Sequence, residues 1–380
     1  VHLFPELRPT PLLSFAIRYL KCDSGVVITA SHNPKEYNGY KAYWNDGAQV
    51  IPPHDENIID EVNKITSFEQ IKLNANADLI HSITSEVEEA YYVELLKLIP
   101  NPEIVSKHKD IPIVFSSIHG TGITLVPEAL KRMGFTNIHI VEEQAKPDGT
   151  FPTVKSPNPE EKSAMELAMK LANKVNANMI FATDPDADRV GVGIRDKSGA
   201  IRLLNGNEAF SLLMWFLLKN QKDVKDAYIA KTIVTSELVD SMADKLGVEC
   251  FNTLTGFKYI ASLMGKLEGK KRFIAAGEES YGYMVGDFIR DKDAVSACAF
   301  FAALAAHAVD AGKSLHDWMI EMHAEFGFYK EHLINVTKKG QQGAQEIKAL
   351  MEKFRNNPPT EIGGSKVVRA LDYKSLVEKN

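Results

Sequence analysis

The sequence predicts an α/β protein with more than one domain. Runs of β-branched and aromatic residues recur along the chain, and most are followed by a polar or glycine-containing loop and then by a segment with helical periodicity. This repeated order of strand, loop and helix favours parallel sheets with helices on both faces. A chain of 380 residues is also too long for one hydrophobic core. We therefore expect two to four domains.

The composition excludes other classes of protein. Hydrophobic residues make up 44% and charged residues 25% of the chain, as in ordinary soluble proteins. A net charge of −6 without a long basic run argues against a nucleic-acid partner, and no apolar stretch reaches the length of a membrane span. The three distant cysteines fit a reducing compartment, and the start lacks a secretory signal. We expect a cytoplasmic protein.

The first region ends near the linker Pro100-Asn101-Pro102. A helix over about 12–20 leads into a strand at 26–28. Ser85 and Glu88 predict a capping box for a second helix, which covers residues 86–99.

The next two regions repeat the alternation, and a shorter tail follows. In the second region we expect strands over 111–115, 138–141, 179–182 and 190–194, and helices over 125–133 and 161–174. In the third we expect helices over 208–219 and 236–246, strands over 227–231 and 273–276, and a buried alanine-rich helix over 294–309. The tail, about 323–380, contains a predicted helix over 341–356 and a strand over 366–370.

A serine loop follows the strand at 26–28. The sequence Thr-Ala-Ser-His-Asn-Pro places Ser31 and His32 where the strand ends, and Lys41 follows an Asn-Gly turn. Such a serine is a candidate nucleophile or phosphoryl carrier. It lacks the Gly-x-Ser-x-Gly context of a hydrolase serine, and the alternative is a simple helix cap. Without a motif, His32 is equally a hydrogen-bonding loop residue and Lys41 a surface lysine.

An acidic loop follows the strand at 179–182. Asp184, Asp186 and Asp188 alternate, so in an extended backbone their side chains share one face and form a hard-oxygen site for Mg²⁺ or Mn²⁺. An EF-hand is excluded, because Arg189 and Arg195 stand where that loop needs Gly and Glu. A solvated acidic turn is the remaining alternative. Arg189 is a candidate partner for a phosphate oxygen or for one of these aspartates.

Four stretches together resemble the α-D-phosphohexomutases, in the order found in that family. They are the serine loop with its Tyr-Asn-Gly-Tyr-Lys continuation, Asp-Pro-Asp-Ala-Asp-Arg at 184–189, Thr-Gly-Phe-Lys at 255–258, and Gly-Glu-Glu-Ser at 277–280. They span most of the chain from Ser31 to Asp293. The resemblance is to the phosphoglucomutase/phosphopentomutase-like branch.

The resemblance implies roles for these residues. Ser31 would carry the phosphoryl group and, with the three aspartates, bind one Mg²⁺ per chain; Lys41, with His32, would transfer protons. The substrate-binding residues implied are Arg189, Thr255, Gly256, Lys258, Glu278, Ser280, Lys292 and His119. Proton transfer by Lys41 near neutral pH requires a lowered pKa. Without the resemblance, His119 is equally a structural residue, and the loops around Glu278 and Lys292 are ordinary charged turns.

The implied fold is three similar mixed-sheet α/β/α domains around a central cleft, plus the start of a fourth α+β domain. We expect them at residues 1–105 (phosphoserine loop), 106–200 (metal loop), 201–322 (sugar loop) and 323–380. The implied reaction moves a phosphoryl group between C1 and C6 of glucose phosphate, with glucose 1,6-bisphosphate as intermediate and activator. The partner is a small phosphosugar, and the protein is a monomer or a dimer.

Alternatives remain open. A phosphopentomutase or hexose-bisphosphate synthase would use the same site, a sugar-phosphate sensor would bind without turnover, and a metal-dependent phosphohydrolase would release phosphate. The family's Gly-Thr-Ser-Gly-x-Arg segment near the start and its Arg-Pro-Ser-Gly-Thr-Glu-type phosphate loop near the end are missing. We therefore expect a piece of a longer protein, with the first and fourth domains incomplete and its activity impaired by the missing phosphate loop.

Overall fold

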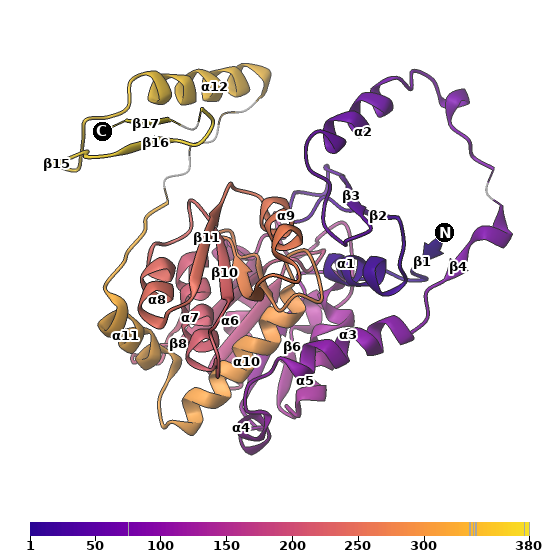
Figure 1. Cartoon of the computed structure of the whole chain (residues 1–380). Coiled ribbons are helices and arrows are strands. Elements are labelled where there is room, and N and C mark those ends of the chain that lie inside the picture. Colours follow the sequence, from indigo (N-terminus) through magenta and orange to yellow (C-terminus); the bar gives the residue numbers. More distant parts are fainter. Residues whose placement is uncertain (75, 334–335, 337, 339, 376, 380) are drawn as a thin grey trace. The chain divides into compact units, whose positions relative to one another are not determined.

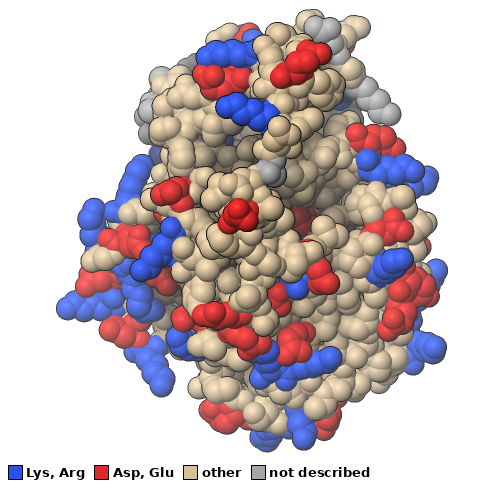
Figure 2. Space-filling view, turned by 90° about the vertical axis from the view of Figure 1, so that its right-hand side faces the viewer, with Lys and Arg blue, Asp and Glu red and all other residues tan. Residues whose placement is uncertain are grey.

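The computed structural model describes residues 1–380 except 75, 334, 335, 337, 339, 376 and 380. The chain forms two compact units, Val1–Tyr329 and Lys330–Asn380 (Figure 1). All of the predicted site residues lie in the first unit. On the face shown in Figure 2, acidic and basic side chains are interspersed without a basic stripe.

The predicted helices are found in the predicted order, whereas the helices at His54–Asn63, Pro102–Lys107, Phe257–Leu267 and Leu315–Phe326 were not predicted. In the first unit the helices are α1 (Thr10–Tyr19), α2 (His54–Asn63), α3 (Glu86–Lys97), α4 (Pro102–Lys107), α5 (Val126–Met133), α6 (Lys162–Lys174), α7 (Gly206–Lys219), α8 (Leu238–Leu246), α9 (Phe257–Leu267), α10 (Ala294–Asp310) and α11 (Leu315–Phe326). Single 3-10 turns lie at Phe68–Gln70, Ala77–Leu79, Thr121–Thr124 and Glu142–Gln144.

Two mixed sheets form the centre of the first unit. One has the strand order β6 (Ile138–Ile140), β5 (Ile113–Ser116), β7 (Met179–Thr183), β8 (Val190–Arg195) and β9 (Ile201–Leu203). The other has the order β11 (Glu249–Thr253), β10 (Ala227–Thr232), β12 (Arg272–Gly277) and β13 (Tyr283–Val285). Strands β5, β6 and β7 run parallel, as do β10, β11 and β12, whereas β8, β9 and β13 are antiparallel to their neighbours. The alternation alone predicted parallel sheets, and the antiparallel strands arise where tight turns replace crossover helices.

The first region contributes short ladders. Strand β2 (Ser24–Ile28) pairs antiparallel with β3 (Tyr40–Trp44), which sets Val27 opposite Lys41. Strand β1 (His2–Leu3) pairs with β4 (His81–Ser82).

Helix α10 is the predicted buried helix. Every residue from Ala294 to Ala308 is buried, and the helix contacts α4, α5, α7, β7, β8 and β13. Its small side chains allow neighbouring elements to approach closely. Within the described residues no single helix is long and apolar enough to cross a membrane, although the bent pair α10 and α11 passes that test by length and composition together.

Two local predictions were wrong. Ser85 has helical backbone angles and its side chain caps nothing, because Glu88 accepts a hydrogen bond from Arg8 Nε at 2.6 Å instead of completing a capping box. The strand predicted over 366–370 is split between two hairpins. The second unit consists of α12 (Gly340–Asn356), β14 (Glu361–Ile362), β15 (Ser365–Lys366), β16 (Ala370–Asp372) and β17 (Val377–Lys379).

Candidate active site

The three aspartates converge in the turn between β7 and β8. Asp184, Asp186 and Asp188 are all buried, and each offers a carboxylate oxygen within 4.8 Å of the others. The extended backbone expected here was wrong, because the hairpin turns sharply and Ala187 takes a left-handed φ of 54°. The backbone N–H groups of Asp188 and Arg189 donate to Asp184 Oδ1, which folds the loop around the first carboxylate. Convergence therefore comes from the turn.

Protein groups bond both oxygens of Asp184 but only one oxygen each of Asp186 and Asp188. Asp184 Oδ1 accepts the two backbone bonds, while its Oδ2 accepts from Ser31 Oγ at 3.1 Å. Oδ2 of both Asp186 and Asp188 accepts from lysine, whereas their Oδ1 atoms are buried without a hydrogen-bond donor in the described part of the chain. Asp188 Oδ1 forms a long ion pair with Arg189 Nε at 3.9 Å. Unpaired buried carboxylate oxygens are costly unless a cation satisfies them. This donor set fits Mg²⁺.

The serine loop of the first region meets this acidic loop of the second. Ser31 is half-buried and takes a left-handed φ of 53°, with its N–H bonded to Thr29 Oγ1 at 2.9 Å. Its Oγ lies 3.1 Å from Asp184 Oδ2 and 3.2 Å from His32 Nδ1. Strain of this kind at a non-glycine residue concentrates at functional sites. The structure therefore brings Ser31, His32 and the three aspartates together.

Two lysines supply the compensating charge. Lys41 Nζ lies 2.8 Å from Asp186 Oδ2 and 3.0 Å from Asp188 Oδ2, and Lys292 Nζ lies 3.1 Å from Asp188 Oδ2. Burial lowers the pKa of Lys41, but the charges of Asp188, Asp186 and Asp291 outweigh it and raise that pKa. The lowered pKa that proton acceptance by Lys41 requires is not found in this metal-free arrangement, which favours the protonated ammonium.

The carboxylates differ in their electrostatic surroundings. Burial, reinforced by Asp186 and Asp188, raises the pKa of Asp184 well above its ordinary value. Burial acts the same way on Asp188, yet the charges of Lys292, Lys41 and Arg189 prevail and lower its pKa. Of these two carboxylates, Asp188 is thus favoured in its ionised form, and Asp184 is less suited to a negative charge in the absence of a cation.

A cavity of about 470 Å³ opens beside these groups. Its lining residues come from all three regions: Ser31, His32, Lys41, Gln49, Arg189, Thr255, Gly256, Phe257, Lys258, Glu278, Glu279, Ser280 and Lys292. All of the predicted site residues except His119 and the three aspartates therefore line one cavity.

The predicted sugar loops are bonded to one another. Glu278 Oε1 accepts from the backbone N–H of Gly256, which precedes α9, at 2.9 Å, and burial raises the pKa of Glu278. Gly256 has a φ of 107°, a conformation that favours glycine. Lys258 Nζ, two residues on, forms an ion pair with Asp55 Oδ2 of α2 at 2.9 Å.

Two carboxylates that bond to residues of the site, Glu160 and Asp291, lie outside the four motif stretches. Arg189 donates to Glu160 Oε1 at 3.1 Å, so its main carboxylate partner comes from outside the acidic loop. Tyr43 Oη and Gln49 Nε2 both donate to the buried Asp291 Oδ2, behind the lysines. The position of Asp291 beside Lys292 was the only sequence signal for this group.

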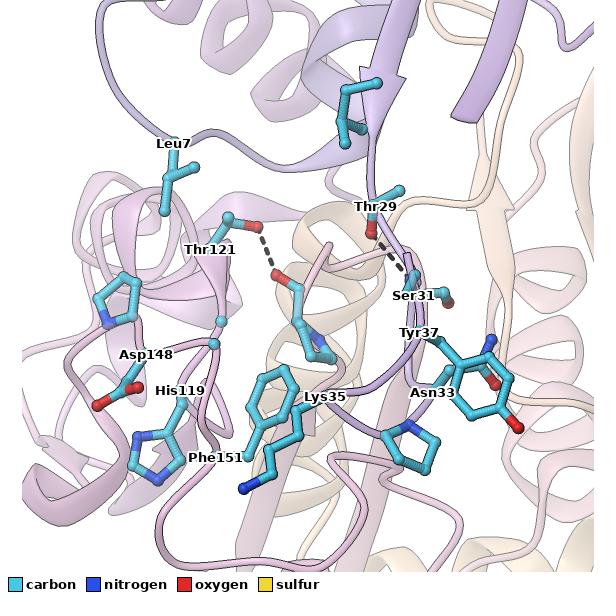
Figure 3. A pocket seen from close by; sticks show the side chains of 17 residues that line it. Leu7, Thr29, Ser31, Asn33, Lys35, Tyr37, His119, Thr121, Asp148 and Phe151 are labelled. Atoms are coloured by element: carbon cyan, nitrogen blue, oxygen red, sulfur yellow. Dashed lines mark hydrogen bonds between the residues drawn. The ribbon is translucent and has the colours of Figure 1, made fainter. Parts of the chain in front are cut away.

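The structure places His119 elsewhere. It lines a second pocket of about 300 Å³ together with Thr29, Asn33, Lys35, Tyr37 and Phe151, and Ser31 lines both pockets (Figure 3). Its ring nitrogens lie 2.9 Å from Thr153 Oγ1 and 3.3 Å from the carbonyl oxygen of Lys146. In the same loop Thr121 Oγ1 donates to the carbonyl oxygen of Pro185 at 2.9 Å, which fixes the acidic turn (Figure 3).

Comparisons with known proteins agree with this arrangement. The phosphoglucomutase/phosphomannomutase α/β/α domain models I, II and III match residues 1–69, 90–198 and 205–326. A phosphoglucomutase of Staphylococcus haemolyticus is 38% identical over 376 residues, covering 99% of this chain and 69% of that protein. A Staphylococcus aureus phosphoglucomutase is also 38% identical, over 98% of this chain and 67% of its own length. The open form of Paramecium parafusin, a phosphoglucomutase, shares the fold with a TM-score of 0.70 at 20% identity, over 100% of this chain and 72% of that one.

The fold and the matches define the protein as a phosphotransferase of the mutase class, an enzyme that acts on small phosphorylated sugars. The chain belongs to the phosphoglucomutase/phosphomannomutase family, within the α-D-phosphohexomutases.

Proposed function

We propose that the chain interconverts glucose 1-phosphate and glucose 6-phosphate through a phosphoserine at Ser31. The observation that carries this proposal is the contact of Ser31 Oγ with Asp184 Oδ2, beside a cavity lined by the side chains that we predict to bind the sugar. The name phosphoglucomutase for relatives at 38% identity supports glucose as the sugar.

The reaction has two balanced half-steps. A sugar hydroxyl attacks the phosphorus of phosphoserine, the bond between Ser31 Oγ and phosphorus breaks, and glucose 1,6-bisphosphate forms. After this intermediate reorients, Ser31 Oγ attacks the phosphorus of its other phosphoryl group, the bond between that phosphorus and the sugar oxygen breaks, and the glucose monophosphate product leaves. In each half-step the attacking oxygen loses a proton and the leaving oxygen gains one. Lys41, assisted by His32, is the proposed carrier: its ammonium donates a proton to the leaving oxygen and recovers the proton of the attacking oxygen, so that the step begins from protonated Lys41.

The remaining residues would bind and orient. Arg189, Lys258 and Lys292 provide positive charge for phosphate. The Glu278 carboxylate accepts hydrogen bonds from sugar hydroxyls, and the Ser280 hydroxyl donates to them. Thr255 and Gly256 shape the loop that holds Glu278. One Mg²⁺, held by Ser31 and the three aspartates, would stabilise the negative charge that develops during phosphoryl transfer. His119 remains a predicted substrate-binding residue, although it lines the neighbouring pocket.

We also propose that the domains lie at residues 1–105, 106–200, 201–322 and 323–380. Glucose 1,6-bisphosphate is the proposed activator. The protein is proposed to be cytoplasmic and to be a monomer or a dimer.

The test is the mass of the intact chain after incubation with glucose 1,6-bisphosphate and Mg²⁺, followed by peptide mapping. We expect a gain of one phosphoryl group at Ser31 that is absent from Ser31→Ala. Ser24→Ala, which removes an exposed serine from the start of β2, is the matched control and should be labelled normally. If the Ser31→Ala variant gains a phosphoryl group, or if the unchanged chain gains none, the proposal of a phosphoserine at position 31 is contradicted. Values of kcat/KM for glucose 1-phosphate and ribose 1-phosphate then decide the sugar.

A further inference from the structure

Helix α1 begins directly against the metal loop. Its first residue, Thr10, is completely buried, and its backbone N–H donates to the carbonyl oxygen of Asp186 at 2.8 Å. The first N–H groups of a helix have no partner within the helix, so this bond satisfies a donor that would otherwise be unpaired. The partly positive end of α1 therefore faces a loop that carries three carboxylates.

The Thr10 side chain makes a second bond to the same residue. Thr10 Oγ1 donates to Asp186 Oδ2 at 3.1 Å, and Lys41 Nζ donates to that same oxygen at 2.8 Å. The other oxygen, Oδ1, is buried and has no donor among the described residues. Two donors on one oxygen fix the rotation of the carboxylate, which leaves Oδ1 directed away from both.

We propose that Thr10 is a positioning residue of the metal site, whose hydroxyl orients Asp186 so that Oδ1 is presented to the cation. This inference rests on the proposed metal-binding role of the three aspartates. Without the hydroxyl, the carboxylate is held only by the flexible Lys41 side chain, and its rotation exchanges the two oxygens. Groups that orient a metal ligand in this way typically change metal affinity 10- to 100-fold when they are removed.

The experiment measures Mn²⁺ affinity of the 380-residue chain by electron paramagnetic resonance. Thr10→Val keeps the shape and the backbone bond but removes the hydroxyl, and we expect it to weaken binding about tenfold. Thr10→Ser retains the hydroxyl and should bind within about threefold of the unchanged chain.

Ser14→Ala is the matched control, one turn further along α1. Ser14 is equally buried, and its hydroxyl donates to the carbonyl oxygen of Gly47 and accepts from the N–H of Arg290, away from the aspartates. We expect this variant to lower Tm without changing Mn²⁺ affinity.

The outcomes separate the two ideas. Normal Mn²⁺ binding by a folded Thr10→Val variant, or an equal loss of affinity in Ser14→Ala, overturns the role of Thr10 and leaves the metal site intact. Absence of Mn²⁺ binding by the unchanged chain overturns the metal site itself, and the role of Thr10 with it. If Thr10→Val does not fold, weakened binding by Thr10→Ser still contradicts the proposal, because the hydroxyl is present.

Discussion

Lys41 and Lys292 hold the same oxygen atom, Oδ2 of Asp188, at 3.0 and 3.1 Å. Asp188 has no exposed surface, so these two ammonium groups replace the water that would otherwise solvate its charge. They come from β3 in the first region and from the loop that precedes α10 in the third. The charge balance of the second region therefore depends on both of the others.

Removal of one ammonium should destabilise the protein strongly. We expect Lys41→Met to lower the free energy of unfolding by about 3 kcal/mol without metal, because it leaves Asp186 and Asp188 partly uncompensated in a buried site. It should also lower kcat by about 10²–10⁴-fold if Lys41 carries protons. Urea unfolding and steady-state kinetics check this. Lys64→Met, which breaks an exposed pair with Glu61 on α2, should change stability by less than about 0.5 kcal/mol. Equal losses in both variants would contradict the argument.

Neutralising Asp184 should have the opposite effect on stability. Its raised pKa means that the folded chain binds a proton more readily than the unfolded chain, so its charge destabilises the fold above the ordinary pKa. We expect Asp184→Asn to raise Tm in metal-free buffer. Addition of Mg²⁺ should then stabilise the unchanged chain but not the variant. A metal-free variant that melts below the unchanged chain would show that repulsion at Asp184 is not the dominant effect.

The bridge between Lys258 and Asp55 should be weak. Their side chains are 30% and 28% exposed, and such pairs contribute about 0–1 kcal/mol. We expect Asp55→Asn to change KM less than threefold, whereas Lys258→Met raises KM about tenfold by removing a cation from the cavity. A double-mutant cycle on KM measures the coupling. A similar KM for both single variants would indicate that Asp55 matters as much as Lys258.

Two glycines offer a comparison of close packing with open space. A Cβ on Gly206, the first residue of α7, would lie 1.7 Å from the carbonyl oxygen of Glu279, so Gly206→Ala should displace the sugar loop and raise KM. A Cβ on Gly265 in α9 would meet nothing within 4 Å. Gly265→Ala should therefore stabilise the protein by about 0.5–1 kcal/mol with unchanged kinetics. Thermal melts and KM distinguish the two, and tolerance of Gly206→Ala would refute the close contact.

His32 gives a pH dependence whose sign is fixed. Burial, followed by the charge of Arg189, lowers the pKa of His32 to about 4. Between about pH 6.5 and 4 the unfolded chain binds this proton and the folded chain does not, so stability declines as the pH falls through this window. We expect His32→Asn to lose less Tm than the unchanged chain between pH 7.5 and pH 5. If Tm falls by the same amount in both proteins between pH 7.5 and pH 5, a neutral, buried His32 is excluded.

The sequence predicted the elements whose patterns are local. The apolar run of α10, the strand before Ser31 and the three aspartates were all recognisable, because each reflects burial or charge within a few residues. Helix α2 was not predicted, since none of its residues is buried and its pattern is weak. The roles of Thr10, Glu160 and Asp291 arise from contacts between distant segments, which spacing does not encode. The direction in which the pKa of Lys41 is shifted could not be predicted for the same reason, since it depends on neighbours identified only in the folded chain.

The sharing of Asp188 by Lys41 and Lys292 also bears on how the protein is made. During synthesis the acidic turn leaves the ribosome before Lys292, so the nascent chain holds three neighbouring aspartates with only part of their counter-charge. Domains generally fold in order from the N-terminus as they emerge. Here the last step of charge compensation requires the loop that carries Lys292, just before α10. The earlier regions therefore reach their final electrostatic balance only when the third one docks.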